Sequence, residues 1–254
     1  DRLFGTCTKA GASFYEMSEM TCDILEGDFR DMIVADYLFS MDRLTGEELW
    51  TYRNGKIFNN TIAAGENSIY LIESRNEETL SDPDGRISAH IFCKSDNHLV
   101  ELDMKTGEKL YERNFQFPFE HIMFLSYTNG YLVAVGTYNV GDRVHYGLYT
   151  FDAENGELKW EQDYEGDPIG GTHGEQWQHP AIVGNRVFSD PFEFDLQTGE
   201  RKPYDFDRGG HSCGGLTASL HYLYGRGGNP RMYPIDVERT RGIRLTCVSR
   251  PGCW

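Results

Sequence analysis

The chain has 254 residues, a formal net charge of −16 at pH 7, and a composition that is 39% hydrophobic and 13% aromatic. This length and composition predict a globular protein with a large core and exclude an intrinsically disordered chain. The negative charge excludes nucleic acid as a partner, because its phosphates would be repelled, and it disfavours an anionic membrane surface. Solubility is the simpler reason for an acidic surface, and a partner that recognises acidic groups is the alternative. No apolar run approaches the ~20 residues that a membrane-spanning helix needs.

The first part of the chain is the hardest to interpret. Residues 1–30 alternate short polar and apolar pieces without a clear period. Residues 32–42, MIVADYLFSMD, alternate in hydrophobicity and predict a strand, a turn and a second strand. Residues 75–88 are polar around Asp82-Pro83-Asp84-Gly85 and predict a surface loop.

Further hairpins are predicted by the same alternation. They cover residues 61–72, residues 122–135 with a turn at Asn129-Gly130, residues 181–188 with a turn at Gly184-Asn185, and residues 216–224 with a poorer turn.

One sequence pattern recurs along the chain. Its copies are LFSMDRLTGEELW at 38–50, LVELDMKTGEKLY at 99–111, LYTFDAENGELKW at 148–160, FEFDLQTGERKP at 192–203 and a diverged MYPIDVERTRGIRL at 232–245. The aspartates of successive copies lie 61, 49, 43 and 41 residues apart. A period in the forties, with a second hairpin between copies, is typical of propeller blades. The sequence therefore predicts an all-β β-propeller of four-stranded antiparallel blades.

Three positions of each copy have a physical role. The aspartate can accept hydrogen bonds from backbone N–H groups two or three residues on, and the glycine supplies the positive φ of a tight turn. The aromatic residue that ends the copy can lie flat against the neighbouring blade. These residues are Asp42, Gly46 and Trp50; Asp103, Gly107 and Tyr111; Asp152, Gly156 and Trp160; and Asp195 and Gly199, with Pro203 at the aromatic position. Unrelated Asp-Gly hairpins are the alternative, and the constant spacing argues against them.

This pattern resembles the tryptophan-docking repeat of the pyrroloquinoline-quinone (PQQ) enzymes and their relatives, A-x-D-x-x-T-G-x-x-x-W. The first copy matches it at Asp42, Thr45, Gly46 and Trp50, whereas the alanine is absent from every copy. The resemblance covers residues 31–247 and implies a PQQ-like propeller. The family includes quinoprotein alcohol dehydrogenases and also pure scaffolds, such as the periplasmic lipoprotein of the outer-membrane barrel-assembly machinery.

The resemblance also bears on domain organisation. About five blades are readable in residues 31–254, whereas the resemblance implies a ring of about seven or eight blades. We therefore expect this chain to be incomplete at its C-terminus and to belong to a larger chain or assembly. Residues 1–30 would form a partial blade or the strand that completes the ring.

Side chains of ligand type stand just ahead of the predicted inner strands. Propeller geometry should bring Asn60, His121, His179 and His211 from four repeats to one face around the axis. Trp177 and Cys213 belong to the same segments. We hypothesise that this face holds a protein partner or a small ligand. The alternative is that these side chains only satisfy loop backbone groups.

A metal site is a second hypothesis. His173, Glu175 and His179 supply the nitrogen and carboxylate donors that suit zinc or copper. The alternative is that His179, which precedes Pro180, only sets the direction of the following strand.

For a working quinoprotein dehydrogenase, the resemblance implies a vicinal cysteine pair over the quinone, a tryptophan beneath it, a catalytic aspartate and a calcium site. No two cysteines are adjacent in this chain. Trp177 could stack on a flat cofactor, but a core position is the simpler interpretation. We therefore expect a binding or scaffold module without PQQ. A quinone- or metal-dependent oxidoreductase that acts at the same face is the alternative.

The cysteines indicate a compartment. An even number of six, with a glycosylation sequon at Asn59-Asn60-Thr61, predicts an oxidising periplasmic or extracellular environment. Cys247 and Cys253 are the first expected disulfide because they are close in sequence, and Cys7 and Cys22 are the second. Free structural thiols are the alternative. The chain begins at Asp1 without a methionine or a signal peptide, which predicts a processed or excised chain.

Overall fold

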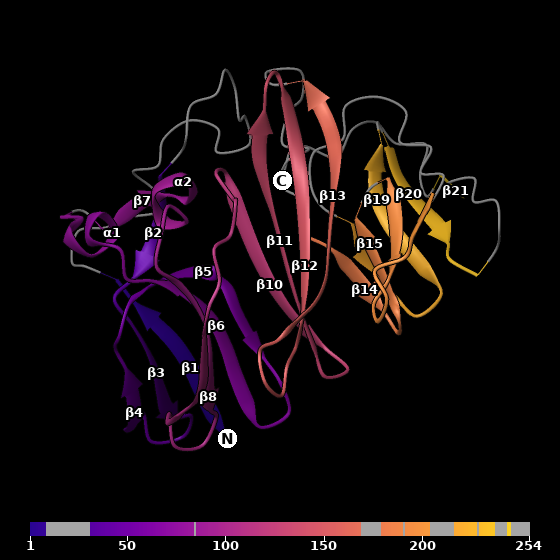
Figure 1. Cartoon of the computed structure of the whole chain (residues 1–254). Coiled ribbons are helices and arrows are strands. Elements are labelled where there is room, and N and C mark those ends of the chain that lie inside the picture. The colour runs from indigo at the N-terminus through magenta and orange to yellow at the C-terminus, as the bar shows by residue number, and fades with distance from the viewer. Residues whose placement is uncertain are drawn as a thin grey trace.

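The computed structural model describes residues 1–8, 31–83, 85–168, 179–189, 191–203, 216–227, 229–236 and 243–244. Within these residues the chain forms five antiparallel sheets, which follow one another in chain order across the molecule (Figure 1). Two short helices, α1 (Glu77–Ser81) and α2 (Ala89–Phe92), accompany the second sheet. The predicted all-β propeller architecture is confirmed.

The strand order of the sheets is that of propeller blades. The first sheet has the order β1-β3-β4 and the second has the order β7-β2-β5-β6-β8-β9. The third, fourth and fifth sheets each have four strands in chain order. The strands of the first two sheets are β1 (Arg2–Cys7), β2 (Asp31–Ala35), β3 (Tyr37–Asp42), β4 (Glu48–Tyr52), β5 (Lys56–Ala64), β6 (Ser68–Ser74), β7 (Arg86–Ser88), β8 (Asn97–Asp103) and β9 (Lys109–Asn114).

The remaining strands complete three further blades. They are β10 (Ile122–Thr128), β11 (Tyr131–Val140), β12 (Arg143–Asp152) and β13 (Leu158–Pro168); β14 (Ala181–Val183), β15 (Arg186–Ser189), β16 (Phe192–Asp195) and β17 (Arg201–Pro203); and β18 (Thr217–Ala218), β19 (Tyr222–Gly227), β20 (Asn229–Pro234) and β21 (Ile243–Arg244).

Clusters of buried side chains fill the spaces between consecutive sheets. In β11, Leu132 and Ala134 pack toward the second sheet, whereas Val133 and Val135 pack with Val187 of the fourth sheet. Because successive side chains of a strand point to opposite faces, a strand between two sheets is apolar on both. This is why β11 is an almost continuous apolar run instead of an alternating one. Its hairpin with β10 turns at Asn129 and Gly130, as predicted, and both residues have positive φ.

In the four copies whose turns the structure describes, the aspartate closes the motif turn. In the first sheet, Leu44 N and Thr45 N both donate to Asp42 Oδ1 at 2.8 Å, and Gly46 N donates to the Asp42 carbonyl at 2.9 Å. These bonds, that of Thr45 above all, hold the pKa of Asp42 below its usual value. In the third copy, Asn155 occupies the threonine position, and its Oδ1 accepts a bond of 2.8 Å from Glu157 N.

The aromatic residue of each of the first three motifs lies against the motif glycine of the next sheet. A Cβ atom on Gly107 would lie 2.6 Å from the Trp50 ring, and one on Gly199 would lie 2.7 Å from the Trp160 ring. Tyr111 covers Gly156 in the same way. Trp50 Nε1 donates to the Met104 carbonyl at 3.3 Å, and Trp160 Nε1 donates to the Leu196 carbonyl at 2.8 Å. Both indoles are therefore held between sheets, with 9% of each residue exposed.

The two strands predicted for residues 32–42 are present as β2 and β3, but they do not pair with each other. β3 pairs with β1, from Arg2 opposite Asp42 to Cys7 opposite Tyr37, whereas β2 pairs with β5 and β7 of the second sheet. Asp36 alone separates β2 from β3, and its N–H donates to the Cys7 carbonyl. One residue is too short for a hairpin turn, so the chain crosses from one sheet to the next at this point.

The prediction of a surface loop for residues 75–88 is also wrong. This segment contains α1 and β7, and Thr79 and Ile87 are buried. Asn76 caps α1, because Thr79 N donates to its Oδ1 at 2.7 Å. Some of the polar residues of this segment therefore cap a helix or are buried, and the others face solvent.

Substitution of two motif glycines should separate backbone strain from aromatic packing. Gly199→Ala and Gly46→Ala both place a side chain at positive φ, +71° and +73°, which costs about 1–2 kcal/mol. Only Gly199→Ala also displaces the Trp160 ring, and such overpacking adds about 1–3 kcal/mol. Urea unfolding followed by circular dichroism should therefore show a larger loss for Gly199→Ala. Equal losses would contradict a role for aromatic packing between sheets.

Candidate functional site

An insertion between β6 and β8 places the most elaborate polar structure among the described residues at one end of the second sheet. It contains α1, β7 and α2 (Figure 1). Ser88 caps α2, because Ile91 N donates to Ser88 Oγ at 3.3 Å. Phe92 of α2 stacks on Phe58 of β5 at 4.0 Å between ring centroids, and both rings are fully buried. The insertion is thus packed onto the blade.

Asn76 is the residue that joins the parts of the insertion. Its Nδ2 lies 2.7 Å from Ser74 Oγ and 3.0, 3.2 and 3.3 Å from the carbonyl oxygens of Ile91, Phe92 and Ser95, and these four acceptors share its two N–H groups. Its Oδ1 caps α1 at the same time. A buried amide that is this fully bonded fixes the relative positions of α1, α2 and the sheet.

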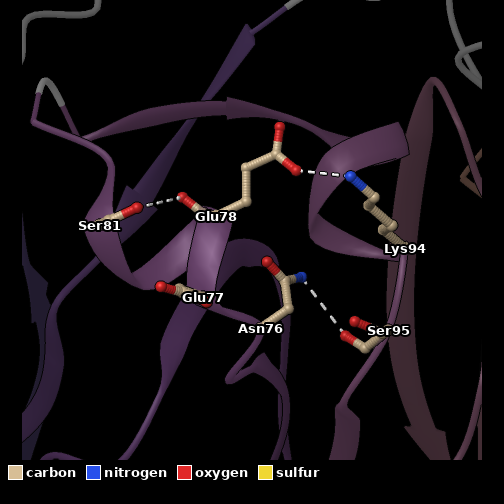
Figure 2. A pocket seen from close by; sticks show the side chains of 6 residues that line it. All are labelled: Asn76, Glu77, Glu78, Ser81, Lys94 and Ser95. Atoms are coloured by element: carbon tan, nitrogen blue, oxygen red, sulfur yellow. Dashed lines mark hydrogen bonds and ion pairs between the residues drawn. The ribbon is translucent and has the colours of Figure 1, made fainter.

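Beside Asn76 the insertion forms an open pocket of about 440 Å³ (Figure 2). It is lined by Asn76, Glu77, Glu78, Ser81, Lys94 and Ser95. Lys94 Nζ lies 2.7 Å from Glu78 Oε2 across the pocket, and both side chains are at least half exposed. The pocket is therefore polar and accessible, with two carboxylates and one ammonium group.

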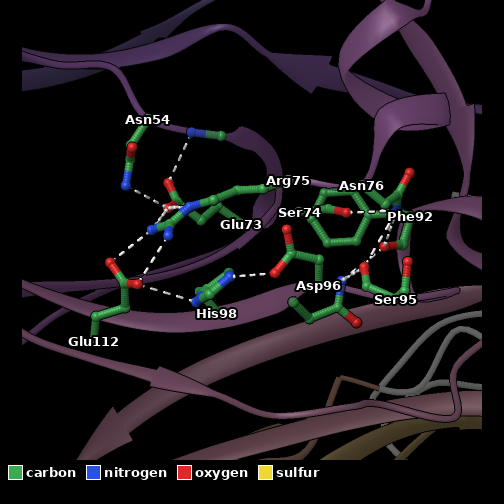
Figure 3. A network of polar contacts seen from close by, with 12 residues as sticks. Asn54, Glu73, Ser74, Arg75, Asn76, Phe92, Ser95, Asp96, His98 and Glu112 are labelled. Atoms are coloured by element: carbon green, nitrogen blue, oxygen red, sulfur yellow. Dashed lines mark hydrogen bonds and ion pairs between the residues drawn. The ribbon is translucent and has the colours of Figure 1, made fainter.

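A buried carboxylate lies under the same end of the sheet. Glu73 is fully buried in β6 and accepts bonds of 3.2 Å from Tyr52 Oη, Asn54 Nδ2 and Gly55 N. Figure 3 shows Glu73 beside Asn54 and Arg75. Arg75 Nε donates to it at 2.8 Å. Burial raises the pKa of the Tyr52 hydroxyl, and the neighbouring Glu73 charge raises it further. A buried charge is tolerated only with such partners.

Arg75 extends this network to β9. Its Nη1 and Nη2 donate to the two oxygens of Glu112 at 2.8 and 2.7 Å, a bidentate pair. These bonds from Arg75 hold the pKa of Glu112 at about 2. His98 lies between Asp96 Oδ1, 2.8 Å from its Nε2, and Glu112 Oε1, 3.2 Å from its Nδ1 (Figure 3). The network therefore connects the base of the insertion to His98 of β8 and Glu112 of β9.

Of the predicted ligand face, Asn60, His121 and His179 are among the described residues, and each has contacts of its own. His121 precedes β10, is 4% exposed, and lies 2.9 Å from Asn139 Oδ1 through its Nε2. His179 instead packs edge-on against Phe124, with ring centroids 5.0 Å apart, and lies 3.3 Å from Ser126 Oγ. The two histidines thus contact different parts of β10 and its neighbours.

Asn60 lies in β5, half-buried, within the stretch between Ile57 and Ile62 where the pairing with β6 is irregular. The other predicted residues of the ligand face and the metal site lie outside the described residues: Trp177, His211, Cys213, His173 and Glu175. Within the described part of the chain, no three His, Cys, Asp or Glu side chains are arranged to hold a metal ion.

His121 belongs to a cluster that includes the insertion. Glu120 Oε2 accepts a bond of 2.8 Å from Asn139 N, and Glu120 Oε1 lies 3.5 Å from Nδ1 of His90 in α2. His90 N also donates to the Glu120 carbonyl. Burial lowers the pKa of His121, because the charged imidazolium loses solvation. The histidine therefore has a packing role beside α2.

The described cysteines form no disulfide. Cys7 and Cys93 are free thiols, and the expected Cys7–Cys22 bond involves Cys22, which lies outside the described residues. Burial raises the pKa of the Cys93 thiol, which makes it unreactive at neutral pH. Cys22, Cys213, Cys247 and Cys253 lie outside the described residues, and the expected Cys247–Cys253 bond lies there with them. No helix among the described residues is long and apolar enough to cross a membrane.

Sequence reasoning missed Glu73, Arg75 and Asn76. The available signal was their place at the end of an apolar strand, SIYLIES, where Glu73 follows five residues that are all buried. A charged residue in such a strand indicates a buried, paired charge instead of a solvent-facing loop.

One solved structure supports the architecture. The crystal structure of BamB from Moraxella catarrhalis matches 85% of this chain and 63% of its own length, with a TM-score of 0.50 and 14% identity. The chain has a β-propeller fold. This chain spans less than two thirds of the length of the BamB chain. The quinohemoprotein alcohol dehydrogenase of Comamonas testosteroni matches 92% of this chain and 44% of its own, with a TM-score of 0.44 and 13% identity. No protein-family model and no curated protein sequence matches the chain.

Loss of the buried carboxylate should destabilise the protein far more than loss of the exposed one. Glu73→Ala leaves Arg75 without one of its two carboxylate partners and the Asn54 and Gly55 donors without an acceptor. Breaking a buried pair in this way costs about 3–5 kcal/mol. Glu78→Ala removes only an exposed ion pair, worth about 0–1 kcal/mol. Urea denaturation measures both, and similar losses would contradict the role assigned to Glu73.

His121 should make stability depend on pH. Its folded pKa lies below the unfolded value, which is about 6.5, so the unfolded chain takes up the proton first as the pH falls. The free energy of unfolding should therefore fall as the pH drops through about 6.5 toward the folded pKa. His121→Gln should remove this part of the decrease while leaving the rest of the profile. Parallel wild-type and variant profiles in urea unfolding from pH 8 to pH 5 would contradict the assignment.

Proposed function

We propose that the protein is a non-catalytic binding module that contacts a protein partner through the insertion of its second sheet. The observation that supports this most is the contrast between the accessible pocket and its buried support. Glu77 and Glu78 are presented to solvent by α1, which Asn76 caps, and Lys94 is presented by the bend that follows α2, which Ser88 caps. A preorganised surface loses little conformational entropy on binding, which favours recognition.

The charge of the pocket indicates the chemistry of the partner. Two carboxylates face one ammonium group, and Lys94 is already paired with Glu78. The remaining negative charge, in a chain with a net charge of −16, favours a positively charged segment. The proposed partner therefore presents lysine or arginine side chains.

The compartment belongs to the same proposal. A periplasmic or extracellular location is supported by the resemblance of the motif to exported PQQ-type propellers and by Asn59 of the sequon, which is exposed. The free thiols of Cys7 and Cys93 do not support an oxidising compartment. Fractionation of the native host, with the protein found in the periplasm or medium, is the expected result.

The absence of a redox cofactor is part of the proposal as well. Elemental analysis and an absorption spectrum of the purified protein should show neither a stoichiometric metal nor a quinone band. A bound quinone or metal with substrate-dependent reduction would replace the binding module with the oxidoreductase alternative.

A lysine-rich fluorescent peptide tests the binding surface directly. Glu77→Gln/Glu78→Gln should weaken its binding about tenfold, or about 1.4 kcal/mol, in fluorescence anisotropy at low salt. The matched control, Glu47→Gln/Glu108→Gln, removes the same charge from two exposed motif turns and should bind like the wild type. Equal weakening in both variants would show a general effect of the acidic surface and refute the insertion as the site.

A further inference from the structure

The ion pair across the insertion pocket is exposed and uses one of the two carboxylates there. Lys94 Nζ lies 2.7 Å from Glu78 Oε2, and the two side chains are 61% and 50% exposed. Among the described residues, Glu78 is the one carboxylate within 4 Å of Lys94 Nζ, and Glu77 forms no ion pair. Figure 2 shows Glu78 extending toward Lys94, whereas Glu77 does not. An exposed pair of this kind contributes little to stability, so a partner can displace it at little cost.

The backbone positions that carry this pair are held in place. Asn76 caps α1, from which Glu78 projects. Lys94 N donates to the Ile91 carbonyl of α2 at 3.2 Å, and Asn76 Nδ2 lies 3.0 Å from the same carbonyl oxygen. The fold therefore sets the spacing between the two attachment points. The exposed side chains of Glu78 and Lys94 can each turn to a different partner.

A basic partner that bound Glu78 would leave Lys94 without its carboxylate. The incoming ammonium group and that of Lys94 would then lie close together beside Glu78. Like charges a few ångströms apart repel each other, and the repulsion grows as bound protein displaces water. Lys94 therefore opposes a partner that has basic side chains alone. A carboxylate on the partner removes this repulsion, because Lys94 can pair with it instead.

We propose that the pocket recognises a protein segment in which a basic and an acidic side chain lie next to each other. Binding exchanges the Glu78–Lys94 ion pair for two ion pairs with the partner: its cation binds Glu78, beside Glu77, and its carboxylate binds Lys94. The pocket volume of about 440 Å³ is within the range of ligand sites, about 300–1,000 Å³. This inference rests on the proposed function, because it specifies the partner of the same pocket.

Two fluorescent peptides of equal length test the exchange. One contains Lys-Ser-Glu and the other contains Lys-Ser-Gln in the same neutral background, so the two outer side chains lie on one side of an extended segment. In fluorescence anisotropy at low salt, the glutamate peptide should bind the full chain about fivefold tighter, the effect of one further surface ion pair. Attraction to the net charge of −16 predicts the opposite order, because the glutamate peptide is less positive.

Substitution of Lys94 separates the ion pair from the net charge. Lys94→Gln should strengthen binding of the glutamine peptide, because the competing ammonium group is gone, and should weaken binding of the glutamate peptide about fivefold. The matched control, Lys105→Gln, removes the same charge from an exposed motif turn and should leave the preference for the glutamate peptide unchanged. The double-mutant cycle between Lys94 and the peptide carboxylate measures their coupling directly.

The outcomes distinguish this inference from the proposed function. Equal or weaker binding of the glutamate peptide to the wild type, or the same reversal of preference in Lys105→Gln, overturns the exchange. If Glu77→Gln/Glu78→Gln still weakens binding of the glutamine peptide in that case, the proposed function stands. If that variant weakens binding of neither peptide, both proposals fail. Displacement of the glutamate peptide by an equal concentration of free lysine would assign the pocket to a small zwitterion and overturn the assignment to a protein segment.

Discussion

An aromatic ring packed on a glycine of the next sheet is the contact that sets the arrangement of this propeller. Hydrophobic burial between sheets is large but not directional, so it would allow neighbouring sheets to slide. The Trp160 indole removes that freedom, because its ring needs the absent side chain of Gly199 and its N–H needs the Leu196 carbonyl. The turn that provides both groups is itself held by Asp195. Local turn chemistry and long-range packing therefore depend on the same few residues.

The copies that depart from the pattern show which parts of it are interchangeable. Tyr111 keeps the ring on Gly156 but has no indole N–H. In the fourth sheet Pro203 provides no ring, and Arg186 instead donates from that sheet to the carbonyl of Ile235 in the fifth at 2.5 Å. A guanidinium from β15 thus makes a directional contact between sheets. Side chains other than the motif tryptophan can therefore make a directional bond between sheets.

The insertion uses the blade as a rigid support. Glu73, Arg75 and Glu112 connect β6 to β9 beneath it, and Asn76 continues this chain of bonds into α1 and α2. Each of these polar groups is buried or half-buried and fully bonded, which is the condition under which buried charge does not destabilise a fold. The backbone that carries Glu77, Glu78 and Lys94 is therefore supported from beneath, although their side chains are exposed. A propeller blade with this support can present a surface for recognition without any chemistry of its own.

The sequence by itself determined the motif turns and the fold class. The bonds from Leu44 and Thr45 to Asp42 span at most three residues, so local spacing predicts them. Tertiary structure alone decided that β1 pairs with β3, that β2 joins the second sheet, and that residues 75–88 pack as helix and strand. It also placed His121 beside Asn139 and His179 beside Phe124, although both stand ahead of inner strands. These outcomes depend on contacts between residues far apart in the chain. A periodic pattern shows which residues form strands, but it does not show which distant strands pair most favourably.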